Sequence, residues 1–170
     1  MIIEMDQSLD TFSEDMRHYQ RERYEEWVKL ANRWGTIAED IAAPKVKTMA
    51  TTLFGCHELD SYERRIMVRS RRDRQRTAEF DFIIVYGNYL FVNETIANNP
   101  NAEFVLDFVG RLTDIFDFFP HYKGKTVIPI FSSLHLPEPI VQLLTKHKIY
   151  AMALGGETME LLNYEAVRQQ

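Results

Sequence analysis

The chain has almost no cysteine and no long apolar run, and each absence excludes a class of protein. Cys56 is the single cysteine among 170 residues, so no internal disulfide can form and a reducing compartment is expected. No apolar run is long enough to cross a bilayer, and no basic-then-apolar signal segment opens the chain. We therefore expect a soluble, cytoplasmic protein with no membrane partner.

The composition is that of an ordinary globular protein. Hydrophobic residues make up 45% and charged residues 26%, which excludes a disordered chain, a collagen-like chain and a disulfide scaffold. A length of 170 residues favours one folded domain rather than two.

An apolar stripe at alternate spacings of three and four predicts a helix near the N-terminus. The stripe consists of Leu9, Phe12, Met16 and Tyr19, then Trp27, Leu30, Trp34, Ile37 and Ile41. We expect Pro44 to end it. A helix over residues 11–43 would be about 50 Å long, too long for a small body to cover. We therefore expect residues 1–30 to be a helical arm, which either forms a homodimer through a short coiled coil or stays mobile, and residues 31–170 to be the folded domain.

The rest of the pattern predicts an α/β fold. Helices are expected after Pro44 and over 99–120 and 137–147, and strands around Ile66 and over 77–86, 89–96, 126–131 and 149–154. Gly87 and Asn88 have the composition of a two-residue hairpin turn. The expected architecture is a mixed central sheet, made of an antiparallel three-strand meander and two parallel strands, with helices on both faces.

Two carboxylates lie inside apolar strand runs, Asp81 in one strand and Glu94 in the next. Strict alternation would put Glu79, Asp81, Ile83 and Val85 on one face of the sheet. A buried carboxylate needs a partner, and Mg²⁺ bound by both acids would supply one. The alternatives are that Glu94 pairs with an arginine of the meander and that Asp81 ends its strand in solvent.

Arginine is concentrated in one short stretch, where residues 64–76 hold seven arginines and no lysine. The planar guanidinium fork suits phosphate oxygens, which favours a nucleic-acid contact on an otherwise acidic chain. The residues predicted to make it are Arg69, Arg71, Arg72, Arg74 and Arg76. The alternative is a solvated hairpin with ion pairs to nearby acids.

The order of these elements resembles the core of the PD-(D/E)XK nuclease superfamily: a helix with a glutamate, three meandering strands with Asp and then Glu-x-Lys, a helix and a strand. Residues 33–163 are also similar to a bacterial branch of that superfamily. The resembling stretches are residues 34–44 (WGTIAEDIAAP), 79–81 (EFD), 92–95 (VNET), 118–120 (FFP) and 154–157 (LGGE).

The resemblance implies a restriction-endonuclease-like fold and a hydrolase of nucleic acid, most simply DNA. It implies that Asp81 and Glu94 bind Mg²⁺ or Mn²⁺ and that Glu39 reaches the metal from the helix. The alternative for Glu39 is a capping box formed with Thr36 at the start of a helix.

The lysine of the pattern is missing, because its position is held by Ile96. Arg111 is the best substitute, since it lies seven residues after Phe104 and so beside the apolar face of its helix. The alternative is an arginine whose stem covers apolar surface while its head stays in water. Two functions follow: a metal-dependent endonuclease with Asp81, Glu94 and Arg111 as catalytic residues, or a catalytically inactive nuclease-like module that binds nucleic acid or protein.

Overall fold

A computed structural model describes the backbone of residues 2–170 and the side chains of residues 14–170 except 24, 27, 28, 31 and 32. The strands are β1 (Ser61–Arg69), β2 (Thr77–Tyr86), β3 (Tyr89–Thr95), β4 (Thr126–Ser133), β5 (Tyr150–Gly155) and β6 (Thr158–Leu161). The helices are α1 (Ile2–Phe54), α2 (Ala102–Thr113), α3 (Ile115–Phe118), the 3₁₀ turn η1 (Pro120–Tyr122), α4 (Glu138–Lys146) and α5 (Tyr164–Arg168). The chain divides into two compact units, Met1–Trp34 and Gly35–Gln170.

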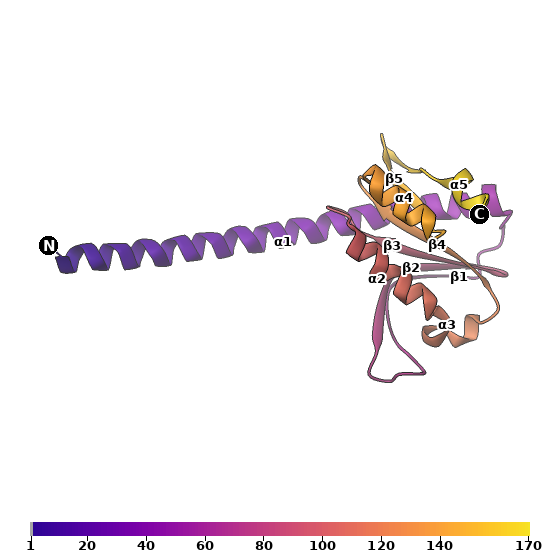
Figure 1. The fold of residues 1–170 in the computed structure, drawn as a ribbon, viewed down its shortest axis with the longest axis horizontal. Coiled ribbons are helices and arrows are strands. Elements are labelled where there is room, and N and C mark those ends of the chain that lie inside the picture. Colours follow the sequence, from indigo (N-terminus) through magenta and orange to yellow (C-terminus); the bar gives the residue numbers. More distant parts are fainter. Residues whose placement is uncertain (1) are drawn as a thin grey trace. The chain divides into compact units, whose positions relative to one another are not determined.

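The second unit is built on one open mixed sheet of six strands in the order β1-β2-β3-β4-β5-β6 (Figure 1). The pairs β1–β2, β2–β3 and β5–β6 are antiparallel, and β3–β4 and β4–β5 are parallel. The α/β class and the mixed sheet are confirmed. The strand order differs from the expected meander with two added strands, because β6 extends the sheet by antiparallel pairing after a tight turn at Gly156 and Glu157.

Helices cover both faces of this sheet (Figure 1). On one face α2, α3 and α4 pack over a core that includes Phe80, Val92 and Phe131. On the other face the part of α1 after residue 35 and the short α5 pack over a second core, which includes Phe82 and Phe91. The strands are therefore buried on both sides, which explains why β2 and β3 read as nearly continuous apolar runs.

Pro44 does not end the first helix, contrary to the sequence prediction, and α1 continues through it to Phe54. Proline removes one helical hydrogen bond and crowds the preceding turn. Ala42, Ala43 and Val46 lie on either side of it and are buried against the sheet, so tertiary packing outweighs the local preference. Because residues 36–39 lie inside this helix, the capping box predicted for Thr36 and Glu39 is wrong.

The alternation of β2 is broken at Asp81. Ala78 and Phe80 pack into the same core as Ile83, although a regular strand would turn residues 80 and 83 to opposite faces. The register pairs Arg64 with Phe82 and Ile66 with Phe80, so Arg65 and Asp81 lie at the same point between these pairs, and Arg65 has a φ of 49°, in the left-handed region. The expected common face for residues 79–85 is therefore wrong, since the β1–β2 hairpin changes its facing at the Arg65–Asp81 pair.

In the first unit the apolar stripe is described in part. Met16, Tyr19 and Leu30 are exposed, while the side chains of Leu9, Phe12 and Trp27 lie outside the described residues. Pairing of two copies through this stripe stays a prediction. Among the residues that the structure describes, no helix is long and apolar enough to span a membrane.

We expect Phe91→Ala to lower the free energy of unfolding by about 3–5 kcal/mol, because it empties a packed aromatic site. Phe91 is fully buried, and its ring lies 5.5 Å from that of Phe54 and 6.1 Å from that of Tyr86. The matched control is Met67→Ala, at a side chain that is 73% exposed, for which we expect a change of no more than about 0.5 kcal/mol. Urea unfolding followed by circular dichroism measures both, and equal losses would contradict this assignment of the core.

Candidate functional site

An acidic pocket of about 480 Å³ opens beside the break in β2. Its charged residues are Glu79, Asp81, Glu94, Asp107 and Arg111, and Thr95 and Ile96 complete the part near the acids. The register of β2 with β3 pairs Phe82 with Asn93, so Asp81 and Glu94 are neighbours across the two strands. The structure therefore brings together the two acids, the arginine and the isoleucine that the sequence singles out.

Glu94 forms a two-pronged ion pair with Arg111. One guanidinium nitrogen of Arg111, Nη2, lies 2.8 Å from Oε1 of Glu94, and the other, Nη1, donates to Oε2 over 2.9 Å. The two side chains are only 13% and 15% exposed. Burial raises the pKa of Glu94, and its hydrogen bond to Arg111 opposes that rise. The arginine predicted to pair with Glu94 comes from α2 and not from the meander.

Two further hydrogen bonds and two aromatic rings fix the guanidinium group of Arg111. Its Nη1 donates to the backbone oxygen of Glu79 over 2.6 Å, and its Nε donates to Asp107 over 3.1 Å. The guanidinium carbon lies 5.4 Å from the ring centre of Phe108 and 5.6 Å from that of Phe80. The head of Arg111 therefore lies in the pocket and not in water. Phe104, the residue from which its position was predicted, is itself 41% exposed.

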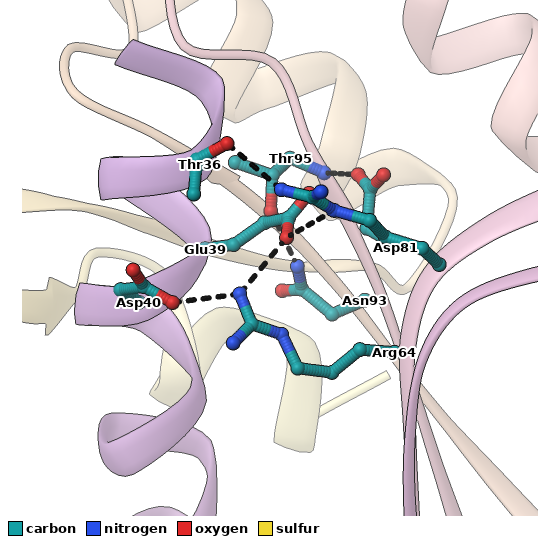
Figure 2. A network of polar contacts seen from close by, with 8 residues as sticks. Thr36, Glu39, Asp40, Arg64, Asp81, Asn93 and Thr95 are labelled. Carbon is teal, nitrogen blue, oxygen red and sulfur yellow. Dashed lines mark hydrogen bonds and ion pairs between the residues drawn. The ribbon is translucent and has the colours of Figure 1, made fainter. Parts of the chain in front are cut away.

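Asp81 is an acid of the pocket that forms no ion pair among the residues whose side chains are described. The backbone N–H of Thr95 donates to its Oδ2 over 2.5 Å, as Figure 2 shows. Burial, and after it the charge of Glu94, raises the pKa of Asp81 from 3.8 to about 7. At neutral pH the pocket thus holds a carboxyl group that is only partly ionised and that a bound cation would ionise fully.

Glu39 belongs to a neighbouring network in which two arginines hold it (Figure 2). It comes from α1 and is 7% exposed, and its Oε2 accepts from Arg64 over 3.2 Å and lies 3.6 Å from Nε of Arg65. Arg64 also donates to Asp40 over 2.6 Å, and Arg65 to Thr36 over 2.8 Å. The negative charge of Glu39 raises the pKa of Asp81 slightly further. Its role as a third metal ligand stays a prediction.

The pocket residues fit a divalent cation of the Mg²⁺ kind as a two-carboxylate site. Mg²⁺ is usually bound through one or two carboxylates and keeps several water molecules, and phosphate oxygens can complete its shell. Four carboxylates and one arginine line the pocket, and the charge of Glu94 adds to the burial that raises the pKa of Asp81. No group of three or more acidic, histidine or cysteine side chains suited to a metal occurs among the described residues.

Asn93 and Ser132 lie next to these acids and were not singled out from the sequence. Asn93 is fully buried, accepts from Ser132 over 2.6 Å and donates to the Thr95 hydroxyl over 2.8 Å. This chain of bonds ties β3 to β4 at the position where Thr95 binds Asp81. A buried amide in an apolar strand is a signal that the sequence does contain, at Val92-Asn93-Glu94.

The predicted nucleic-acid arginines lie in and around the loop between β1 and β2. Arg76 pairs with Asp114, and Nε of Arg72 lies 3.6 Å from Asp117. Arg69, Arg71 and Arg74 are exposed and form no ion pair among the described residues. Two of the five arginines, Arg72 and Arg76, therefore form the ion pairs expected of a solvated hairpin.

Comparisons with known proteins add no identification. No family model, no curated protein and no solved structure matches this chain.

We expect the Glu94–Arg111 pair to behave as a unit in unfolding experiments. Arg111→Met should cost about 3 kcal/mol, because it leaves the carboxylate of Glu94 buried without a partner. The double variant Arg111→Met, Glu94→Leu should recover most of that loss, because an apolar pair replaces an ionic one. Urea unfolding of the two single variants and the double variant completes the cycle. Losses that simply add up would show that the two side chains are not coupled.

Asp81 should make the metal-free protein less stable as the pH rises. The folded-state pKa of about 7 lies above the unfolded value near 3.8, so the folded state binds the extra proton between these two values. The free energy of unfolding should therefore fall between about pH 4 and pH 7, by up to about 4 kcal/mol. Asp81→Asn should flatten this slope. Urea unfolding in EDTA at several pH values measures it, and identical slopes for both proteins would refute the raised pKa.

Proposed function

We propose that this chain is a Mg²⁺-dependent phosphodiesterase of the PD-(D/E)XK type that acts on DNA, with Asp81, Glu94 and Arg111 as its catalytic residues. The single observation that carries the proposal is the pocket in which these three side chains meet, beside Ile96 at the position of the missing lysine. The element order of a glutamate-bearing helix, three antiparallel strands, a helix and a strand supports a restriction-endonuclease-like core.

Asp81 and Glu94 would hold the metal. When bound, Mg²⁺ supplies a water of lowered pKa and stabilises negative charge on a phosphate oxygen. Asp81 is prepared for this role because the N–H of Thr95 fixes one carboxylate oxygen, while no hydrogen bond is formed to the other oxygen among the described residues. The carboxyl group loses its proton when a cation neutralises the pocket, so its pKa should fall below about 7 on binding.

Arg111 takes over the charge of the absent lysine. Isoleucine at position 96 can neither donate a hydrogen bond nor carry charge, and it packs against the core with its backbone N–H donating to Ser132 over 2.9 Å. The guanidinium of Arg111 lies in the same pocket and is aimed by Asp107, by Glu94 and by the two phenyl rings. A phosphate group entering the pocket would accept hydrogen bonds from this fork, which matches phosphate oxygens in pairs.

The contact between Arg111 and Glu94 links the binding of substrate to the binding of the metal. In the structure Arg111 occupies both oxygens of Glu94. A substrate phosphate would compete for the guanidinium of Arg111, and the carboxylate of Glu94 would then be free to hold the ion. Substrate and metal are therefore expected to bind cooperatively.

The second candidate function is a nuclease-like module that binds without cutting. The same two-pronged ion pair favours it, because Arg111 already neutralises Glu94 and Ile96 supplies no general acid or base. In that case the pair is a structural element of the pocket, and the sheet and its loops carry the interaction with nucleic acid or protein.

A cleavage assay separates the two candidates. Supercoiled DNA, linear DNA and single-stranded RNA are incubated with the protein and Mg²⁺ or Mn²⁺. We expect metal-dependent cutting of DNA that falls at least about a hundredfold in Asp81→Ala and in Glu94→Ala, because each removes a group that stabilises charge in the transition state. Arg111→Lys should keep part of the activity and Arg111→Ala should lose it.

Glu157→Gln is the matched control, since it removes an exposed carboxylate outside the pocket. Titration calorimetry with Mg²⁺ alone and circular dichroism show whether each variant is folded and binds the ion. Wild-type protein that is folded, binds Mg²⁺ and cuts none of the substrates would exclude the first candidate and leave the second.

A further inference from the structure

The loop between β1 and β2 carries a local positive charge on a negative chain. Residues 69–76 contain five arginines and one aspartate, a net charge of +4, whereas the whole chain has a net charge of −5. Arginine binds phosphate oxygens with a planar pair of donors, so a cluster of this kind suits a polyphosphate ligand.

The arginines of this loop divide into two sets. Arg76 is tied to Asp114 and lies 5.2 Å from the ring centre of Phe118, and Arg72 lies near Asp117. We call the exposed residues Arg69, Arg71 and Arg74 the outer arginines, and among the described residues they form no ion pair. The first set attaches the loop to α3, and the outer arginines leave three guanidinium groups for a ligand.

The backbone of the loop is fixed by its own hydrogen bonds. The N–H of Ser70 donates to the oxygen of Arg76 over 2.9 Å, and the N–H of Arg76 donates to the oxygen of Asp73 over 3.0 Å. The N–H of Arg71 donates to the oxygen of Asp117 over 2.9 Å, which joins the loop to α3. A ligand therefore meets a loop that is already ordered and does not have to be ordered on binding.

The loop leads directly into the acidic pocket. Thr77, Ala78 and Glu79, which follow it, line the pocket, and Figure 1 shows the loop end of the hairpin extending past the sheet near α3. The four residue-to-residue steps from Thr77 to Asp81 span about 13 Å of strand. One DNA strand carries a phosphate for about every 3.4 Å of helix axis, so the outer arginines reach backbone roughly four or more nucleotides from a phosphate in the pocket.

We propose that the outer arginines Arg69, Arg71 and Arg74 are a docking surface for the sugar-phosphate backbone of duplex DNA, several nucleotides away from the phosphate held in the pocket. The inference rests on the proposed function, because it names how the substrate of that pocket is held. DNA is favoured over an acidic membrane because a linear row of phosphates can run from the outer arginines to the pocket, where Arg111 supplies the one further guanidinium. Contacts with the sugar-phosphate backbone do not distinguish one base from another. The surface therefore determines the affinity for DNA and the position of the duplex, and not the base sequence that is bound.

The test compares two triple variants with the same change in charge. The first variant is Arg69→Ser, Arg71→Ser, Arg74→Ser. The control variant is Lys123→Ser, Lys146→Ser, Arg168→Ser, at exposed cations elsewhere in the second unit. Binding of a fluorescein-labelled 24-base-pair duplex is measured by anisotropy in Ca²⁺, at salt concentrations from 50 to 200 mM. Cleavage of the same duplex and of the small diester bis(p-nitrophenyl) phosphate is measured in Mg²⁺.

We expect the first variant to lose about one phosphate contact per arginine, which lowers the slope of log affinity against log salt concentration. Between 50 and 200 mM salt the factor by which the wild type loses affinity should therefore be about 40 times larger than the factor for this variant. The control should keep the wild-type slope. Hydrolysis of the small diester should be unchanged in both, since that substrate is too short to reach the loop.

Each remaining outcome is decisive. Equal slopes for the first variant and the wild type, or equal losses in both variants, would overturn the docking surface. Stronger binding of the wild type to vesicles of anionic lipid than to the duplex would assign the arginines to a membrane instead. A reduced slope with no hydrolysis of either substrate by the wild type would keep the docking surface and reject the proposed phosphodiesterase, so the two failures are distinguishable.

Discussion

The carboxylates of Asp81 on β2 and Glu94 on β3 are buried side by side, and the pocket depends on how their charges are compensated. Glu94 obtains a cation from Arg111, which two aromatic rings and Asp107 hold in place. Asp81 accepts one backbone N–H and forms no ion pair among the described residues, and burial, followed by the charge of Glu94, raises its pKa. A polypeptide that solved only its own stability would place an apolar residue at position 81, since a buried acid costs free energy. The buried acid is therefore the feature of the pocket on which the proposed metal site depends.

The break at Arg65 and Asp81 gives the pocket its position. A regular β2 would carry its side chains in strict alternation, and the loop beyond it would continue in the plane of the sheet. Because β1 and β2 change facing together, Phe80 still reaches the core under α3 while Asp81 opens beside Glu94. Beyond the break the arginine-rich loop lies against α3, where Asp114 and Asp117 attach it. The acidic pocket and the basic loop therefore both adjoin this part of the β1–β2 hairpin.

Much of this arrangement follows from local sequence signals, and the rest depends on contacts between distant residues. The Gly87-Asn88 turn, the aromatic and branched residues of β2 and β3 and the apolar spacing of α2 are local signals, so these strands and this helix were predictable. Helix α1 passes Pro44 because Ala42 and Val46 are buried against the sheet, and nothing near the proline encodes that. Strand β6 has four residues, too few for a period to be recognised. Asp81, Glu94 and Arg111 could be named from their patterns, whereas their ion pairing and the role of Asn93 required the register of β2, β3 and β4.

The structure of crystals grown or soaked with Mn²⁺ and a short DNA duplex would test the central claim most directly, because anomalous scattering locates the ion without reference to activity. We expect one peak between the carboxylates of Asp81 and Glu94, with Arg111 turned from Glu94 toward a phosphate of the duplex. A structure with the duplex bound, no peak between these acids, and Arg111 still on both oxygens of Glu94 would contradict it.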